Sequence, residues 1–177
     1  MIKQIINPSV KDKSTTIILL VDEDRRSTAI LSNSLEQLYK VHVVHSGEEA
    51  IEFCQQRLPD LIFLDVMMPN LDGYVTCKIL RTLEGMQYCP IIFSTSLTGI
   101  EDEIKCWEAG GTDFLAKPVS PVTLLMRVQA HIRLKSQSDA SKFSAILDGI
   151  SGLRKRRHFD NCNLHEVNSN CNNDAEL

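Results

Sequence analysis

Polar side chains that could do chemistry follow four of the short apolar runs in the sequence. The acidic triplet Asp-Glu-Asp at residues 22–24 follows the first run, and Asp65 follows the third. Thr95 comes soon after the fourth run, and Lys117 comes directly after the fifth. If these runs are parallel strands, their carboxyl ends meet at one edge of a sheet, where such folds place their ligand sites. We therefore expect all of these groups to lie together.

The chemistry that this set predicts is phosphoryl transfer assisted by a divalent cation. Carboxylates about 4 Å apart repel by about 4 kcal/mol per pair at an effective dielectric constant of about 20, so they stay ionised together only beside a cation. Oxygen ligands favour a hard ion such as Mg²⁺. An ammonium and a hydroxyl stabilise a phosphoryl group, which a central carboxylate can accept covalently. Lys117 precedes Pro118, a candidate for a cis bond that aims the lysine inward.

Each of these residues also has an ordinary structural explanation. An acidic triplet after a strand often only stabilises the N-terminus of a helix through its dipole. A Lys-Pro pair is usually a turn, and a threonine at a strand end is usually a structural hydroxyl. Their joint occurrence at one edge, in this order, is what favours a functional site.

The elements that must position these residues show as short apolar runs alternating with longer amphipathic stretches. The expected strands are Ile17–Val21 and residues 41–44, 61–64, 91–93 and 114–116. The expected helices span residues 25–38, 47–57, 73–83, 100–109 and 120–135. Five alternations of strand and helix predict an α/β fold, a doubly wound five-stranded parallel sheet with helices on both faces.

The motifs ILLVDED, LIFLDVMMPNLDGY, IIFSTS and AGGTDFLAKPVSP occur in this order within residues 16–135. With these motifs, the segment resembles the receiver domain of bacterial two-component response regulators, which has a flavodoxin-like fold. The resemblance implies that Asp65 accepts a phosphoryl group from a sensor histidine kinase or phosphotransfer protein in a Mg²⁺-dependent reaction. The protein would then switch conformation to control an output. Its only catalysis would be its own phosphorylation and slow dephosphorylation.

The resemblance also implies roles for individual residues. The ligands of Mg²⁺ would be Asp22, Glu23, Asp65 and the backbone carbonyl of Met67. The switch hydroxyl would be Thr95, the phosphate partner Lys117 and the rotating aromatic Phe114. At the second acidic position the family usually has aspartate, so the longer arm of Glu23 would shift the ion or weaken its binding.

Further segments are expected on both sides of this domain. Residues 1–15 form an N-terminal extension, residues 136–147 a linker helix that continues the last helix, and residues 161–177 a disordered tail. Residues 148–160, DGISGLRKRRHFD, resemble the opening of the first helix of a diguanylate cyclase (GGDEF) domain. Only 17 residues follow, so we expect a truncated remnant without cyclase activity. The GGTDF at residues 110–114 lies inside the receiver and is not the signature loop of a cyclase.

Composition limits the remaining function classes. The 177 residues carry a formal net charge of −4, which argues against nucleic-acid binding. No apolar run approaches the roughly 20 residues of a membrane span, and no secretory signal is visible, so a cytoplasmic protein away from membranes is expected. The six cysteines form no CxxC pair and are expected to be reduced and structural.

Two other functions stay open from the sequence. The chain could be the regulatory receiver half of a diguanylate cyclase whose catalytic domain is missing from it. It could also be an interaction module that works without phosphorylation. For the receiver itself, a homodimer through the 100–135 face or the 120–150 helix is one expected form of output.

Overall fold

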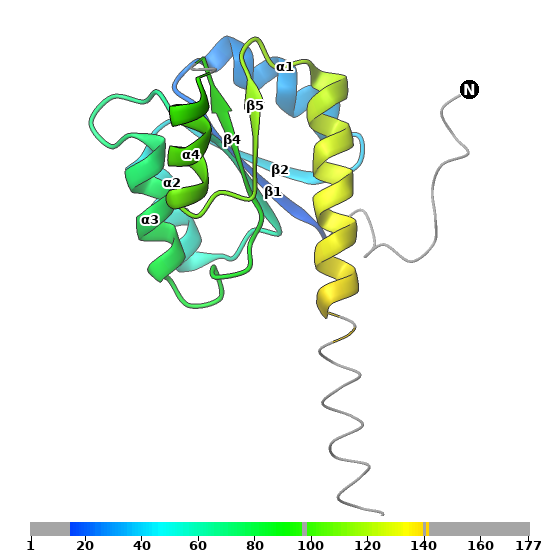
Figure 1. Ribbon diagram of the computed structural model, residues 1–177. Coiled ribbons are helices and arrows are strands. Elements are labelled where there is room, and N and C mark those ends of the chain that lie inside the picture. Colours follow the sequence, from blue (N-terminus) through cyan, green and yellow to red (C-terminus); the bar gives the residue numbers. More distant parts are fainter. Residues whose placement is uncertain (1–14, 97–98, 140, 142–177) are drawn as a thin grey trace, which may run out of the picture. The chain divides into compact units, whose positions relative to one another are not determined.

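The computed structural model describes residues 15–96, 99–139 and 141 of the chain (Figure 1). The chain divides into two units, Met1–Ser136 and Gln137–Leu177, and the sheet with its helices belongs to the first. The cyclase-like segment 148–160 and the tail 161–177 lie outside the described residues, as do residues 1–14 and most of the 136–147 linker. A search of the described helices finds none long and apolar enough to cross a membrane.

Five strands form one parallel sheet with the order β2-β1-β3-β4-β5. They are β1 (Ile17–Val21), β2 (Lys40–Val44), β3 (Leu61–Asp65), β4 (Ile91–Thr95) and β5 (Asp113–Ala116). The expected doubly wound five-stranded parallel sheet is therefore confirmed. The chain runs outward from β1 to β2 and then crosses back to β3, so strand order reverses between β1 and β3. This reversal is where such sheets form a ligand crevice at their carboxyl ends.

Helices cover both faces of the sheet. They are α1 (Arg25–Leu35), α2 (Gly47–Gln56), α3 (Gly73–Thr82), α4 (Ile100–Glu108) and a helix over residues 121–139, called the C-terminal helix below. Figure 1 shows α2, α3 and α4 on one side of the sheet and the C-terminal helix, in yellow, on the other. Helix α1 ends three residues before the expected residue 38, because the N–H groups of Leu38 and Tyr39 both donate to the Leu35 carbonyl at 2.9 Å.

Alternation along the strands divides the core into two clusters, one on each face of the sheet. Leu19 and Phe93 belong to the cluster beneath α2, α3 and α4. Leu20 and Phe63 belong to the cluster beneath α1 and the C-terminal helix. Strands β3 and β4 are buried at every position, as expected for a parallel sheet with two covered faces.

Side-chain caps fix where the helices after β1 and β3 begin. Asp24 accepts a hydrogen bond from the Arg26 N–H at the start of α1. Asp72 accepts one from the Val75 N–H at 2.8 Å at the start of α3. Such a cap stabilises a helix by about 1 kcal/mol. Both caps keep the connection between strand end and helix short, which limits the movement of the strand-end carboxylates.

Candidate functional site

Three of the predicted residues, Asp22, Asp65 and Lys117, meet at the carboxyl ends of β1, β3 and β5. Each lies two positions after a residue of the core cluster beneath α1, so strand alternation places all three side chains on that face of the sheet. Both aspartates are 2% exposed, and the lysine side chain is 26% exposed. The site is therefore buried on the aspartate side and reachable from solvent at the lysine.

Lys117 bridges the two carboxylates. Its Nζ lies 2.8 Å from Asp65 Oδ2 and 3.1 Å from Asp22 Oδ2. Its backbone N–H donates to the Thr95 carbonyl at 2.8 Å, which continues the pairing of β4 and β5 by one residue. The Lys117–Pro118 peptide bond, the candidate for a cis bond in the sequence, is cis. The ammonium supplies the cation that two buried carboxylates require.

Burial and neighbouring charges shift the pKa values of this group. Burial raises the pKa of Asp65 most, the hydrogen bond from Lys117 opposes that rise, and repulsion by Asp22 adds to it, so the net pKa lies above the ordinary value of 3.8. Burial alone would lower the pKa of Lys117, but the hydrogen bonds to Asp65 and Asp22 outweigh it and raise the pKa above 10.5. Lys117 is therefore a cation at neutral pH, and the charge of Asp65 is incompletely compensated.

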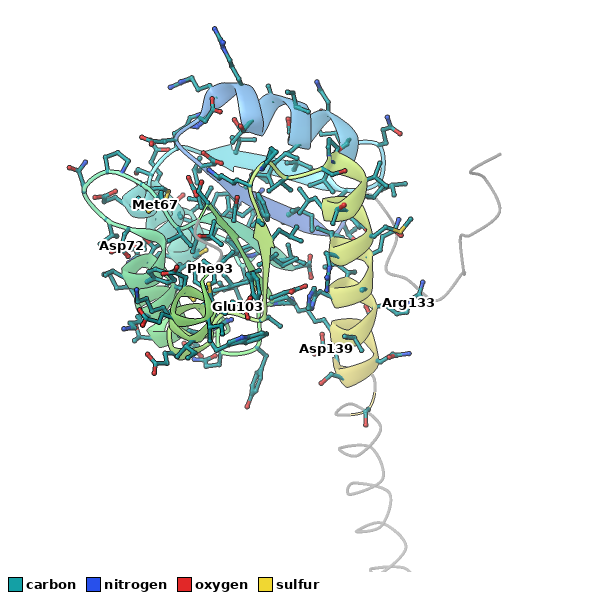
Figure 2. All side chains as sticks on the ribbon, turned by 45° about the horizontal axis from the view of Figure 1, so that its top comes forward. Met67, Asp72, Phe93, Glu103, Arg133 and Asp139 are labelled. Carbon is teal, nitrogen blue, oxygen red and sulfur yellow. The ribbon has the colours of Figure 1, made fainter. Side chains whose placement is uncertain are left out.

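The loop between β3 and α3 holds Asp65 in place. The Met67 N–H donates to Asp65 Oδ1 at 3.2 Å, and Figure 2 shows Met67 on this loop. Asn70 has a φ of 65°, a left-handed conformation that asparagine tolerates better than most residues. Gly73 starts α3 so close to β3 that a Cβ there would collide with the Asp65 carbonyl oxygen. The stretch PNLDG thus builds the turn that seats α3 against the end of β3.

The three acidic residues after β1 have different environments. Asp22 faces Lys117, and its Oδ1 accepts the Asp24 N–H at 2.9 Å. Asp24 caps α1, and the hydrogen bond from the Ser27 hydroxyl, followed by that from the Arg26 N–H, lowers its pKa. Glu23 is exposed and takes no part in the ion pairs of Lys117. The structure therefore brings Asp22, and not Glu23, to Asp65.

The donor chemistry of the site fits the Mg²⁺ that the resemblance implies. Asp22 and Asp65 offer carboxylate oxygens to the same ammonium, and Mg²⁺ needs only one or two carboxylates beside its waters. Within residues 15–96, 99–139 and 141, no group of three His, Cys, Asp or Glu side chains is placed to hold a metal ion. Asp22 and Asp65, the two carboxylates that Lys117 joins, are the pair that the geometry of the site brings together for Mg²⁺.

Thr95 and Phe114, the predicted switch residues, lie on neighbouring strands. Thr95 is buried at the end of β4, and Phe114 is half-buried on β5 opposite Phe93. The indole of Trp107 on α4 meets the Phe114 ring edge-on, with centroids 6.4 Å apart and an interplanar angle of 83°. Trp107 was not among the predicted residues, although its spacing from Ile104 marks an apolar side of α4.

A cavity of about 510 Å³ lies beside these ion pairs. It is lined by Asp22, Asp24, Ser27, Ile30, Leu31, Ser94, Lys117, Pro118 and Val119. Ser94 is the register partner of Asp65 and is fully buried, and its hydroxyl has no hydrogen-bond partner among the described residues. Ser94 was also missed in the sequence. The available signal was its position two residues after Ile92, which places a polar side chain on the same face as Asp65.

Comparison with protein-family models shows which family this site belongs to. Residues 18–129, more than half of the 177-residue chain, match the model described as "Response regulator receiver domain". The chain belongs to the response regulator receiver domain family. The family expected from the sequence motifs is confirmed: the chain carries a two-component response regulator receiver domain, which is activated by phosphorylation. The match gives no support to a GGDEF domain in this chain.

Individual relatives of the receiver agree with this assignment. The chain is 36% identical over 119 residues to "Response regulator PleD" of Caulobacter vibrioides, covering 67% of this chain and 26% of the relative. It is 32% identical over 139 residues to a "Probable cyclic di-GMP phosphodiesterase" of Vibrio cholerae, covering 78% of this chain and 32% of the relative. The chain thus spans about a third or less of these two proteins.

A solved receiver structure has the same fold. The receiver domain of the sensor histidine kinase PA1611 from Pseudomonas aeruginosa is 31% identical, with a TM-score of 0.62 over 66% of this chain and 97% of that one. That structure has a magnesium ion coordinated in its active site cleft. Receivers of this family therefore bind Mg²⁺ in the active site.

Proposed function

We propose that Asp65 is the phosphoacceptor of this receiver and that the donor is a phosphohistidine on a sensor histidine kinase or a phosphotransfer protein. A carboxylate oxygen of Asp65 attacks phosphorus, the P–N bond breaks, and its electron pair remains on the imidazole nitrogen. The product is an acyl phosphate on Asp65. Water later hydrolyses it, which returns the carboxylate and releases inorganic phosphate.

The observation that carries this proposal is the ion pair between Lys117 and Asp65. The ammonium lies 2.8 Å from an oxygen of the carboxylate that would become phosphorylated. An ammonium held in this position before the reaction stabilises negative charge as it develops on the phosphoryl oxygens, without reorganisation of solvent. The second carboxylate, Asp22, keeps Lys117 oriented at 3.1 Å.

In this proposal the Mg²⁺ ligands are Asp22, Asp65 and the backbone carbonyl of Met67, with Glu23 acting from its exposed position. The bound ion would offset the negative charge of the phosphoryl oxygens. The magnesium ion in the active site cleft of the Pseudomonas receiver supports this. Removal of Mg²⁺ by a chelator is expected to stop phosphorylation.

We further propose that Thr95 and Phe114 carry the phosphorylation state to α4. Thr95 ends β4, and Phe114 lies on the adjacent strand in edge-on contact with Trp107 of α4. A hydroxyl drawn toward the phosphoryl group would change the space open to the Phe114 ring. The ring in turn contacts the helix that would form part of an output surface. Phosphorylation need only favour one of two existing packings.

Control of a diguanylate cyclase is a second candidate for the output. It is favoured by residues 148–160, which resemble the opening of a GGDEF domain. The Vibrio relative, whose name refers to cyclic di-GMP, aligns over 139 residues of this chain. Sequencing the gene beyond codon 177 tests this candidate: a GGDEF-type loop there supports it, and a stop codon contradicts it.

Phosphorylation by acetyl phosphate tests the main proposal. The wild type and Asp72→Asn are incubated with acetyl phosphate and Mg²⁺, beside Asp65→Asn, and separated on a gel that retards phosphoproteins. Asp72→Asn is the matched control because Asp72 lies in the same loop, is exposed, and caps a helix as well when it is asparagine. Only Asp65→Asn is expected to lose retardation. An unmodified wild type would instead favour an interaction module that works without phosphorylation.

A further inference from the structure

Ser94 presents a buried hydroxyl to the acidic site. Its exposure is 0%, and its Oγ makes no hydrogen bond to any residue that the structure describes. It is the register partner of Asp65 and lines the same cavity as Asp22 and Lys117. A buried hydroxyl without a partner destabilises a fold, whereas an apolar side chain of the same shape does not. Stability of this state alone gives no reason for a serine here.

Lys117, which lines the same cavity as Ser94, has a hydrogen-bond donor that is not directed at a carboxylate. An ammonium carries three N–H groups, and two of them are directed at Asp65 and Asp22. A divalent cation on these carboxylates occupies oxygens that Lys117 now contacts. The ammonium must then give up at least one carboxylate and needs another acceptor. The cavity gives it room to move toward Ser94.

We propose that Ser94 is a positioning residue that accepts a hydrogen bond from Lys117 when the lysine gives up a carboxylate. The bond forms directly or through one water, for which a polar cavity of this size has ample room. Ser94 thereby makes the site easier to load, and it acts through Lys117 without touching the phosphoryl group. The inference rests on the function proposed above, because it assigns a role to Lys117 in the loaded site.

Ser94→Val and Ser94→Thr form a matched pair for the test, because valine and threonine have nearly the same shape and differ by the hydroxyl. The cavity beside Ser94 leaves space for the added methyl group. Three quantities are compared with the wild type: the free energy of unfolding without divalent ions, the Mg²⁺ dissociation constant, and the rate constant of phosphorylation by acetyl phosphate. Isothermal titration calorimetry measures Mg²⁺ binding.

Ser94→Val is expected to be at least as stable as the wild type without divalent ions. Its affinity for Mg²⁺ and its rate constant of phosphorylation are each expected to fall about tenfold. This is the effect expected from the loss of one hydrogen bond to a charged group. Ser94→Thr is expected to stay within about twofold of the wild type in Mg²⁺ affinity and in phosphorylation rate constant, because it keeps the hydroxyl. If Ser94→Val does not fold, Ser94→Ala, which adds no bulk, replaces it with the same expected losses.

Two results would overturn the role of Ser94. One is a Ser94→Val protein that equals the wild type in Mg²⁺ affinity and rate. The other is an equal loss in Ser94→Val and Ser94→Thr, which would show that shape matters and the hydroxyl does not. Failure of the proposed function looks different: the wild type itself would take up no phosphoryl group. In that case the Mg²⁺ affinities of the matched pair still decide the role of Ser94.

Discussion

The charge of Asp65 links the stability of the domain to pH. Its pKa is raised above the ordinary value of 3.8, chiefly by burial. The folded chain therefore holds a proton on this carboxyl at pH values where the unfolded chain has lost it. Between the pKa of Asp65 in the unfolded chain and its higher pKa in the folded chain, the folded state binds more protons. The contribution of Asp65 to the free energy of unfolding therefore falls as the pH rises through this range.

Asp65→Asn is accordingly expected to increase the free energy of unfolding at pH 7 without divalent ions. The amide removes a desolvated charge and the repulsion by Asp22, which together outweigh the lost pairing with Lys117. The gain should shrink as the pH is lowered from 7 to 4, because the wild-type carboxyl takes up its proton as the pH falls. Urea denaturation at both pH values, with Asp72→Asn as control, measures it. A variant less stable than the wild type at pH 7 would contradict this.

Trp107 is the single tryptophan of the chain and contacts the Phe114 ring edge-on. Its fluorescence should therefore report movement of that ring. Beryllofluoride with Mg²⁺, a mimic of the phosphoryl group, is expected to change the emission of the wild type. In the Phe114→Leu variant most of this change in emission should be lost, although the variant should still bind the mimic. An undiminished change in Phe114→Leu would show that the indole senses something other than the ring.

Among the contacts between helices and strands, the close packing of α3 against the end of β3 shapes the site most directly. A Cβ on Gly73 would collide with the carbonyl oxygen of Asp65 and press on Val66. Gly73→Ala is therefore expected to destabilise the domain by about 2 kcal/mol, as overpacking does. It should also slow phosphorylation, because the end of β3 must shift.

Thermal or urea unfolding and the acetyl phosphate assay measure both effects of Gly73→Ala. Gly99→Ser is the control. Among the described residues, a Cβ there would contact only the flexible Asp102 carboxylate, at 3.3 Å, and serine is a good cap for α4. Equal stability and rate in Gly73→Ala and Gly99→Ser would refute the claim that close packing of α3 shapes the site.

The elements themselves could be predicted to within four residues from apolar runs and amphipathic spacing. Asp65 and Thr95 prove to be the last residues of their strands, where loops were expected to begin. Side-chain partners were harder to predict because they depend on burial and on distant loops. Arg81 shows this: its guanidinium donates to the carbonyls of Met86, Cys89 and Gly110, the last being 29 residues away. The Lys117 bridge and the unpartnered Ser94 hydroxyl likewise follow from geometry that no spacing reveals.

At the scale of the whole receiver, α4 and the C-terminal helix expose apolar side chains. Trp107, Val122 and Met126 are 52%, 66% and 58% exposed. The C-terminal helix is held to β5 by Arg127 and His131, which lie 3.2 and 3.1 Å from Asp113 Oδ2. These pairs fix one side of the helix and leave the apolar side chains available to a second copy of the chain.

Beryllofluoride with Mg²⁺ is expected to promote self-association through this surface, measured by sedimentation velocity from about 1 to 100 µM. Burial of one such apolar side chain stabilises an association by about 1.5–3 kcal/mol, so Met126→Glu should weaken the dimer at least tenfold. Val75→Glu, a 42% exposed position on α3, is the control and should associate like the wild type. A single mass with and without the mimic would exclude dimerisation as the output of this chain.

The most direct test of the central claim is to locate the phosphoryl group itself. After reaction with acetyl phosphate and Mg²⁺, borohydride reduces an acyl phosphate to an alcohol and releases phosphate, which leaves a permanent mark on the residue that carried it. Peptide mass spectrometry then reads the position. The account predicts a homoserine at residue 65 that depends on Mg²⁺. A mark at Asp22, Glu23 or Asp24, with residue 65 intact, would contradict it.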